Sequence, residues 1–225
     1  MMFRIMEVLG LSEKPERKNE KRRKMKKKGS VLIFLGVLCI IAAMALFLYN
    51  MYADKTAGDA SDGILSSLEN TMDDNSDAWK GTTVDPDDAA DMSLPAAEID
   101  GIKYIGRLTV PDLGLKLPVA AEWSYKTLKK SPCVYTGSVY TGNLVICAHN
   151  YARHFGRLKS LKQGAKVVFT DLDGNDYTYK VTSLETVMPK AIDTMITGDD
   201  WDLTLFTCTI GGRTRIAVRC ERIDE

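Results

Sequence analysis

The chain has few of the residues that build metal or phosphate sites. Only two of its 225 residues are histidines, no CxxC pair occurs, and no glycine-rich phosphate loop is present. A zinc site needs several Cys or His ligands at short spacing, and a phosphate loop needs clustered glycines. The sequence therefore predicts no metal and no cofactor.

Cysteines are also sparse. The chain has five, namely Cys39, Cys133, Cys147, Cys208 and Cys220. Small exported domains that depend on disulfides carry denser cysteine frameworks, and this chain is long enough to bury a core of its own. We therefore predict free thiols.

The chain has no net charge, but its charges are segregated. Residues 1–30 hold 11 lysines and arginines against 4 acidic residues, whereas residues 53–100 hold 2 against 13. The basic cluster 21–28 adjoins an apolar run, which argues against a nucleic-acid site and predicts a cytoplasmic basic segment over residues 1–30.

The apolar run is continuous from residue 31 to residue 48. About 20 such residues cross a bilayer as a helix, so we predict a membrane-spanning helix over residues 31–52. A cleaved signal peptide is the alternative, but its apolar region is usually about 7 to 15 residues long. The basic flank predicts a single-pass protein of the cell membrane, with a cytoplasmic N-terminus and all residues after 52 outside.

Two different segments follow the apolar run. Residues 53–97 are acidic and poor in aliphatic side chains, which predicts a flexible stalk with one short helix near residues 64–72. Residues 98–225 predict a mainly β domain, with a hairpin at Asp173 and Gly174 and a small helix at 154–162. Strands are expected at 103–110, 115–120, 143–149, 165–171, 176–187, 203–209 and 214–223. This pattern favours a closed barrel or a sandwich.

Cys208, His149 and one of the arginines that follow Cys208, namely Arg213, Arg215 or Arg219, could together form a site for thiol catalysis. Cys208 lies in a strand-like run, His149 ends another, and Arg215 begins the strand that follows Cys208. A thiol nucleophile needs a proton-transfer group, and an arginine can hold an oxyanion. Each residue could also be structural, since buried cysteines are common and usually inert.

The run "TLFTCT", with a following arginine and an upstream strand ending in "AHN", resembles the signature of the sortases. The segment "YIGRLTVPDLGLKLPV" is similar to the opening strand pair of that family. The resemblance covers nearly all of residues 98–225. It implies a closed sortase-type β-barrel of about eight strands with one or two short helices, preceded by a single transmembrane helix.

The resemblance also implies residue roles and partners. Cys208 would be the nucleophile, His149 the general acid and base, and Arg215 the group that binds the oxyanion and the substrate. Four further residues would contact substrate: Cys147, Asn150, Thr207 and Val119. The partners would be surface proteins with an LPxTG-like sorting motif and an amine acceptor, either a cell-wall precursor or a pilin subunit. The loop 189–202 lies where the family's specificity loop sits.

Three alternatives remain open at this point. Hydrolytic thiol peptidases of the papain type place Cys before His, the reverse of the order here. A membrane-tethered binding domain with a core Cys208 would carry no activity. Finally, "LPAAE", residues 94–98, partly resembles a sorting motif and could act as an autoinhibitory segment, although it is also an ordinary linker sequence.

Overall fold

The structure is a computed structural model that describes residues 15–75, 94–190 and 200–223. The chain divides into two units, residues 1–52 and residues 53–225. Much of the predicted segment 1–30, the middle of the predicted stalk and most of the loop 189–202 lie outside the described residues.

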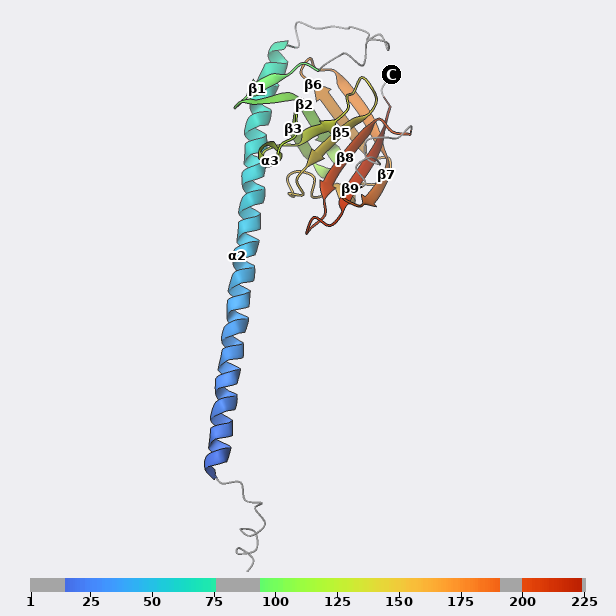
Figure 1. The fold of residues 1–225 in the computed structure, drawn as a ribbon. Helices are drawn as coiled ribbons and strands as arrows, with labels where there is room; N and C mark the ends of the chain where they lie inside the picture. Colours follow the sequence, from blue (N-terminus) through green and yellow to red (C-terminus); the bar gives the residue numbers. More distant parts are fainter. Residues whose placement is uncertain (1–14, 76–93, 191–199, 224–225) are drawn as a thin grey trace, which may run out of the picture. The chain divides into compact units, whose positions relative to one another are not determined.

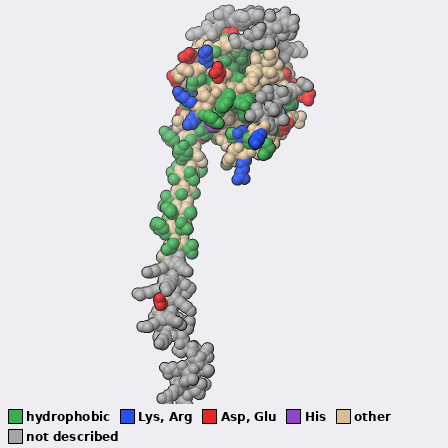
Figure 2. Space-filling model, viewed as in Figure 1, with side chains coloured by type: hydrophobic (Ala, Val, Ile, Leu, Met, Phe, Trp, Pro, Cys, Tyr) green, Lys and Arg blue, Asp and Glu red, His purple; other side chains and the backbone are tan. Residues whose placement is uncertain are grey.

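Helix α2 (Pro15–Asn75) contains the apolar run. Among the described residues it is the one helix long and apolar enough to cross a membrane. Figure 2 shows hydrophobic side chains along its surface, and Val31, Phe34 and Tyr52 are each at least 65% exposed. An apolar helix surface left open in this way suits a lipid environment better than water.

Residues 53–75 differ from the flexible stalk predicted for them, because α2 continues through them to Asn75. The predicted short helix at 64–72 lies within this longer helix. One stripe of the segment is buried, formed by Ala57, Ser61, Ile64, Leu68 and Met72. Their spacing of three or four residues places them on one helix face, and packing that face against the β domain stabilises a helix that composition alone disfavours.

Eight strands close into a barrel, in the order β2-β3-β4-β5-β8-β9-β7-β6, and β6 pairs back onto β2 (Figure 1). Their bounds are β2 (Ile102–Val110), β3 (Leu115–Ala120), β4 (Cys133–Thr136), β5 (Leu144–Ala148), β6 (Lys166–Asp171), β7 (Asp176–Val187), β8 (Leu203–Cys208) and β9 (Arg215–Arg222). A short strand β1 (Ala97–Ile99) pairs with β2. The other described elements are the helix α3 (Tyr125–Leu128) and two 3-10 turns, η1 (Pro111–Leu113) and η2 (Leu158–Ser160). The predicted fold class is therefore confirmed.

Glycine permits the closure of the barrel at one point. Gly106 has φ of 152°, and a Cβ placed there would lie 2.1 Å from the carbonyl oxygen of Thr170 on β6. Only glycine combines that backbone angle with so close an approach of two strands. The barrel interior is filled by aliphatic and aromatic side chains, including Leu108, Phe169 and Leu205, all fully buried.

The seven predicted strands are all present, and the hairpin at Asp173 and Gly174 joins β6 to β7. Strands β1 and β4 were missed, and the predicted helix at 154–162 is wrong, since only the turn η2 forms there. Gly156 explains this difference. Its amide donates to the carbonyl oxygen of Tyr151, and the chain folds back so tightly that a Cβ at Gly156 would lie 2.5 Å from the Asn150 carbonyl oxygen.

The segment 94–98 leads directly into the barrel. Leu94 packs against the core, and Ala97 and Glu98 pair with β2. These contacts suit a strand that leads into the barrel.

Candidate active site

The register of two parallel strands brings His149 beside Cys208. β5 and β8 are parallel, and Ala148 on β5 is paired with Thr207 on β8. His149 and Cys208 each follow one residue later, at the same end of the two strands. The hydroxyl of Thr207 donates to the carbonyl oxygen of Ala148 over 2.9 Å, which ties the strands together just before both residues.

Arg215 reaches the same end through the next strand. β8 and β9 are antiparallel, and Cys208 is directly paired with Arg215. Residues directly opposite each other in an antiparallel pair extend from the same face of the sheet. The thiol and the guanidinium therefore share a face, and His149 lies at the neighbouring strand end.

This face points away from the barrel core. Leu203 and Leu205 are buried in the core, so the alternate residues Phe206 and Cys208 face outward. On β9, Val218 lies in the core, whereas Arg215 lies on the outward face. Inward and outward residues therefore alternate along β9.

Cys208 is half-buried and is the most accessible thiol of the barrel domain, because Cys133, Cys147 and Cys220 are buried. Burial raises the pKa of Cys133 and of Cys220 to about 12, and it raises the pKa of Cys147 as well. A buried thiol with a high pKa carries almost no reactive thiolate at neutral pH.

We therefore expect iodoacetamide to label Cys208 at least about tenfold faster than the three buried thiols at neutral pH. Peptide mapping by mass spectrometry after brief exposure measures this ratio. Unfolding the protein in denaturant provides the control, since all four thiols should then react at similar rates. Equal labelling of Cys208 and Cys220 in folded protein would contradict the assignment.

His149 is half-buried, and its ring lies 5.1 Å from that of Tyr151. Desolvation lowers the pKa of His149, and the nearby positive charge of Lys129 lowers it further. The imidazole is therefore mainly neutral at neutral pH. A neutral imidazole can accept a proton, and it returns that proton readily once protonated.

Arg215 is held at the turn between β8 and β9. Its Nη1 donates to the carbonyl oxygens of Gly212 at 3.0 Å and Thr214 at 3.1 Å. Arg213 lies exposed in the same turn. The turn therefore fixes one arginine near Cys208 and leaves the other in solvent.

Arg219 lies on the same face but is buried and held by several partners. Its guanidinium carbon lies 4.4 Å from the centre of the Trp201 ring, and Nη1 donates to Thr204 Oγ1 at 2.9 Å. Nη2 lies 3.8 Å from Glu185 Oε2. Burial lowers its pKa, and Glu185 partly opposes that effect. Arg219 therefore stabilises the pairing of β8 with β9, four residues along the strand from Arg215 on the same face.

Three of the four predicted substrate contacts have buried side chains. Val119 is fully buried in the core, Thr207 is 3% exposed, and Cys147 is 5% exposed in a second apolar cluster that includes Leu68 of α2. None of the three can present its side chain to a bound peptide, which corrects the prediction for them. Asn150 is exposed beside His149 and remains a candidate.

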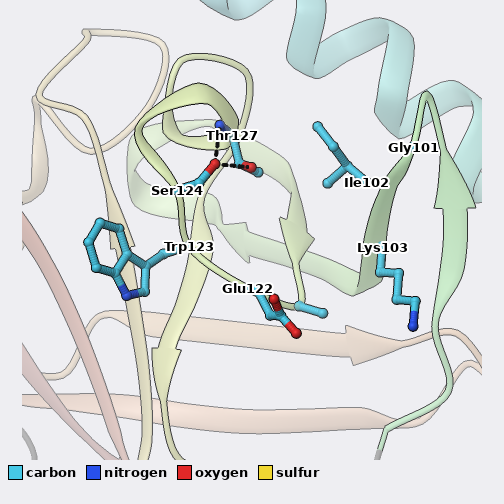
Figure 3. A pocket seen from close by; sticks show the side chains of 8 residues that line it. Gly101, Ile102, Lys103, Glu122, Trp123, Ser124 and Thr127 are labelled. Atoms are coloured by element: carbon cyan, nitrogen blue, oxygen red, sulfur yellow. Dashed lines mark hydrogen bonds between the residues drawn. The ribbon is translucent and has the colours of Figure 1, made fainter.

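An aromatic series on the outer surface was missed by the sequence analysis. Phe206 meets Tyr135 edge to face at 5.4 Å, and Tyr135 stacks on Trp123 at 6.0 Å. Trp123 also borders a pocket of about 380 Å³ whose wall includes Glu122 and Ser124 (Figure 3). Phe206 belongs to the "TLFTCT" run, but β4, which carries Tyr135, had no clear sequence signal.

The described residues contain no group of three or more His, Cys, Asp or Glu side chains placed to hold a metal ion.

Comparison with known proteins identifies relatives of the barrel domain. A family model of the sortase domain matches residues 108–223. Sortase A of Bacillus anthracis is 28% identical over 130 residues, which are 56% of this chain and 60% of that protein. A putative sortase of Bacillus subtilis, YwpE, is 32% identical over 88 residues, 37% of this chain and 85% of the relative.

Solved structures agree in fold. Sortase C from Clostridium perfringens superposes with a TM-score of 0.50 at 25% identity, covering 76% of this chain and 96% of that chain. Sortase C of Streptococcus pneumoniae gives 0.51 at 21% identity, covering 77% and 95%.

Proposed function

The chain belongs to the sortase family, and from that premise we propose that it is a membrane-anchored cysteine transpeptidase. It cleaves surface proteins at an LPxTG-like sorting motif and transfers the acyl group to an amine. The observation that carries this proposal is the register of β5, β8 and β9, which brings His149, Cys208 and Arg215 to one strand end.

Cys208 acts in the first half-reaction as the nucleophile. Its thiolate sulfur attacks the carbonyl carbon of the scissile peptide bond, and the oxyanion that forms accepts hydrogen bonds from Arg215. His149, in its protonated form, donates a proton to the departing amine nitrogen as the C–N bond breaks. The product of this step is a thioester on Cys208.

The second half-reaction reverses the proton transfer. The acceptor amine gives a proton to His149 and attacks the thioester carbonyl carbon, and the C–S bond then breaks to restore the thiolate. The acceptor is an amine of a cell-wall precursor or of a pilin subunit, and the new bond is an amide. The apolar part of α2 anchors the enzyme in the cell membrane, with the basic cluster 21–28 on the cytoplasmic side.

We place the substrate contacts on the outward face of the sheet. Asn150 is exposed beside His149, and Phe206 lies two residues before Cys208 on its face. The rings of Tyr135 and Trp123 extend this surface away from the nucleophile. Aromatic side chains give large contact areas at a small entropy cost, which suits the binding of an extended peptide.

The decisive experiment incubates the full chain, in detergent, with a library of LPxTG-like peptides and an amine acceptor. Mass spectrometry follows ligated product and any acyl adduct on Cys208. Ligation supports the transpeptidase. Hydrolysis alone, with the acceptor in excess, would support a thiol peptidase, and the absence of both product and adduct would support a binding domain.

Replacement of Arg215 by glutamine is expected to lower kcat by about 10²- to 10³-fold, because a donor to the oxyanion is lost. The matched control is Arg213→Gln, which removes an exposed arginine from the same turn and should leave the rate unchanged. Steady-state ligation kinetics measure both variants. Equal effects of the two substitutions would indicate a general charge effect instead of an oxyanion contact.

A further inference from the structure

The segment 53–75 of α2 forms part of the same unit as the barrel, and its acidic side reaches the loop that carries His149. Its buried stripe includes Ala57, Ile64 and Leu68, so it packs against the barrel along most of its length. Helix and barrel are also joined by ion pairs of Glu69 with Arg107 at 3.4 Å and with Lys116.

Arg153 links the loop to this segment. It lies four residues after His149, and its backbone amide donates to Asp54 Oδ1 at 3.2 Å. Its guanidinium donates through Nη1 to Asp59 Oδ1 at 2.8 Å and through Nη2 to Asp62. Three carboxylates on successive turns of one helix therefore hold a single loop residue.

Gly58 provides the space in which Arg153 lies. A Cβ at Gly58 would lie 2.2 Å from the Nε atom of Arg153 and 2.4 Å from its Cζ atom. Any other residue would displace the side chain from the helix surface. The side chain of Arg153 therefore packs directly on Gly58, although the two residues are far apart in the sequence.

The loop that carries His149 and Arg153 is compact. The amide of Phe155 donates to the carbonyl oxygen of His149 at 3.2 Å, and the Phe155 side chain is fully buried in the core. The Tyr151 ring lies between the rings of His149, at 5.1 Å, and His154, at 5.6 Å. The loop thus has one fixed point in the core, at Phe155, and another on α2, at Arg153, and His149 is joined to the first by a backbone hydrogen bond.

We propose that Arg153 is a positioning residue: the acidic side of segment 53–75 holds it, and through it sets the place of His149 beside Cys208. This inference rests on the proposed role of His149 in acyl transfer. The arginine is 40% exposed and its partners Asp59 and Asp62 are 57% and 61% exposed. Ion pairs this exposed add little to stability, so their loss should affect the position of the loop more than folding.

The test uses charge reversal in the full chain in detergent. The variants are Arg153→Glu, the pair Asp59→Arg with Asp62→Arg, and all three substitutions together. Lys159→Glu, at an exposed site in η2, is the matched control. Because a misplacement of about 1 Å can cost about 10²-fold in rate, we expect Arg153→Glu to lower kcat by about that factor with little change in KM or Tm. The triple variant should recover most of the loss.

A second measurement does not depend on activity. The chain has two histidines, so ¹³C-labelled histidine gives two ring signals in the NMR spectrum. The two are separated by titration, since burial lowers the pKa of His154 to about 4. The His149 signal should shift or broaden in Arg153→Glu and return in the triple variant.

The outcomes distinguish the two proposals. An unchanged His149 signal in Arg153→Glu, or a rate loss that charge reversal does not repair, overturns the positioning role. A shifted signal with full activity also overturns it, because the loop would then move without consequence. Failure of the proposed function appears earlier, as wild-type protein that ligates no peptide.

Discussion

Replacement of Cys208 by alanine is expected to reduce ligation by about 10⁶-fold, to the background of the assay, because the acyl-enzyme cannot form. Cys147 lies on the neighbouring strand β5, but its side chain is buried and burial raises its pKa, so it should not replace Cys208 as the nucleophile. Mass spectrometry should detect a thioester adduct on the wild-type protein and none on the variant.

Cys220→Ala is the control for this substitution. Cys220 is fully buried in the core on β9, so the variant loses packing but no reactive group. It should keep wild-type activity, with at most a lowered Tm. Residual ligation by Cys208→Ala at more than a thousandth of the wild-type rate would mean that another residue carries the acyl group.

Replacement of His149 by glutamine should lower kcat by about 10³- to 10⁴-fold, because general acid and base catalysis by the imidazole is lost. Glutamine preserves size and hydrogen bonding but cannot ionise. The variant should therefore also lose the dependence of kcat on the ionisation of His149. If the plot of kcat against pH keeps its shape in the variant, His149 does not take part in the proton transfer.

The surroundings of His149 allow a companion test with a defined sign. Lys129 helps to lower the pKa of His149, so Lys129→Gln should raise that pKa toward its ordinary value near 6.5. At a fixed pH above the pKa, the protonated fraction of His149 then increases. Titration of the two histidine signals by NMR measures the change, and that of His154 should stay near its value of about 4.

The position of segment 53–75 affects how such experiments are designed. The sequence suggests that the catalytic domain begins near residue 98, but a chain cut there would lose Ile64 and Leu68 from the second apolar cluster. It would also lose Asp59 and Asp62, which hold Arg153. The tests that depend on His149 therefore require the full chain.

Local patterns in the sequence predicted most of the strands but not β1 and β4. The long strands alternate apolar and polar residues, and that period is visible without any partner. β4 has only four residues and meets β3 through the single pair of Ala120 and Cys133. It is a strand because it lies between β3 and β5 in the barrel, and its own residues show no strand pattern. The sequence therefore did not predict that Tyr135, on β4, would form part of an aromatic surface.

Residue type alone was a poor guide to substrate contacts. Val119 and Thr207 belong to segments that the family resemblance places near the site, yet both face the core, because successive side chains of a strand point to opposite faces. The burial of Cys147 depends in addition on the apolar cluster to which Leu68 of α2 contributes. The residues of β5 alone do not predict that α2 packs over Cys147.

The sequence by itself determined the properties that depend on neighbouring residues: the long apolar helix, the alternation of β9, and the placement of Cys208 and Arg215 on strands joined by a tight turn. The tertiary structure alone decided which distant segments meet. His149 and Cys208 lie at neighbouring strand ends only because barrel closure sets β5 parallel to β8 in one register, and Arg153 meets Asp59 only because helix segment 53–75 packs on the barrel. Both arrangements follow from the burial of apolar surface by the whole domain, which no local period encodes.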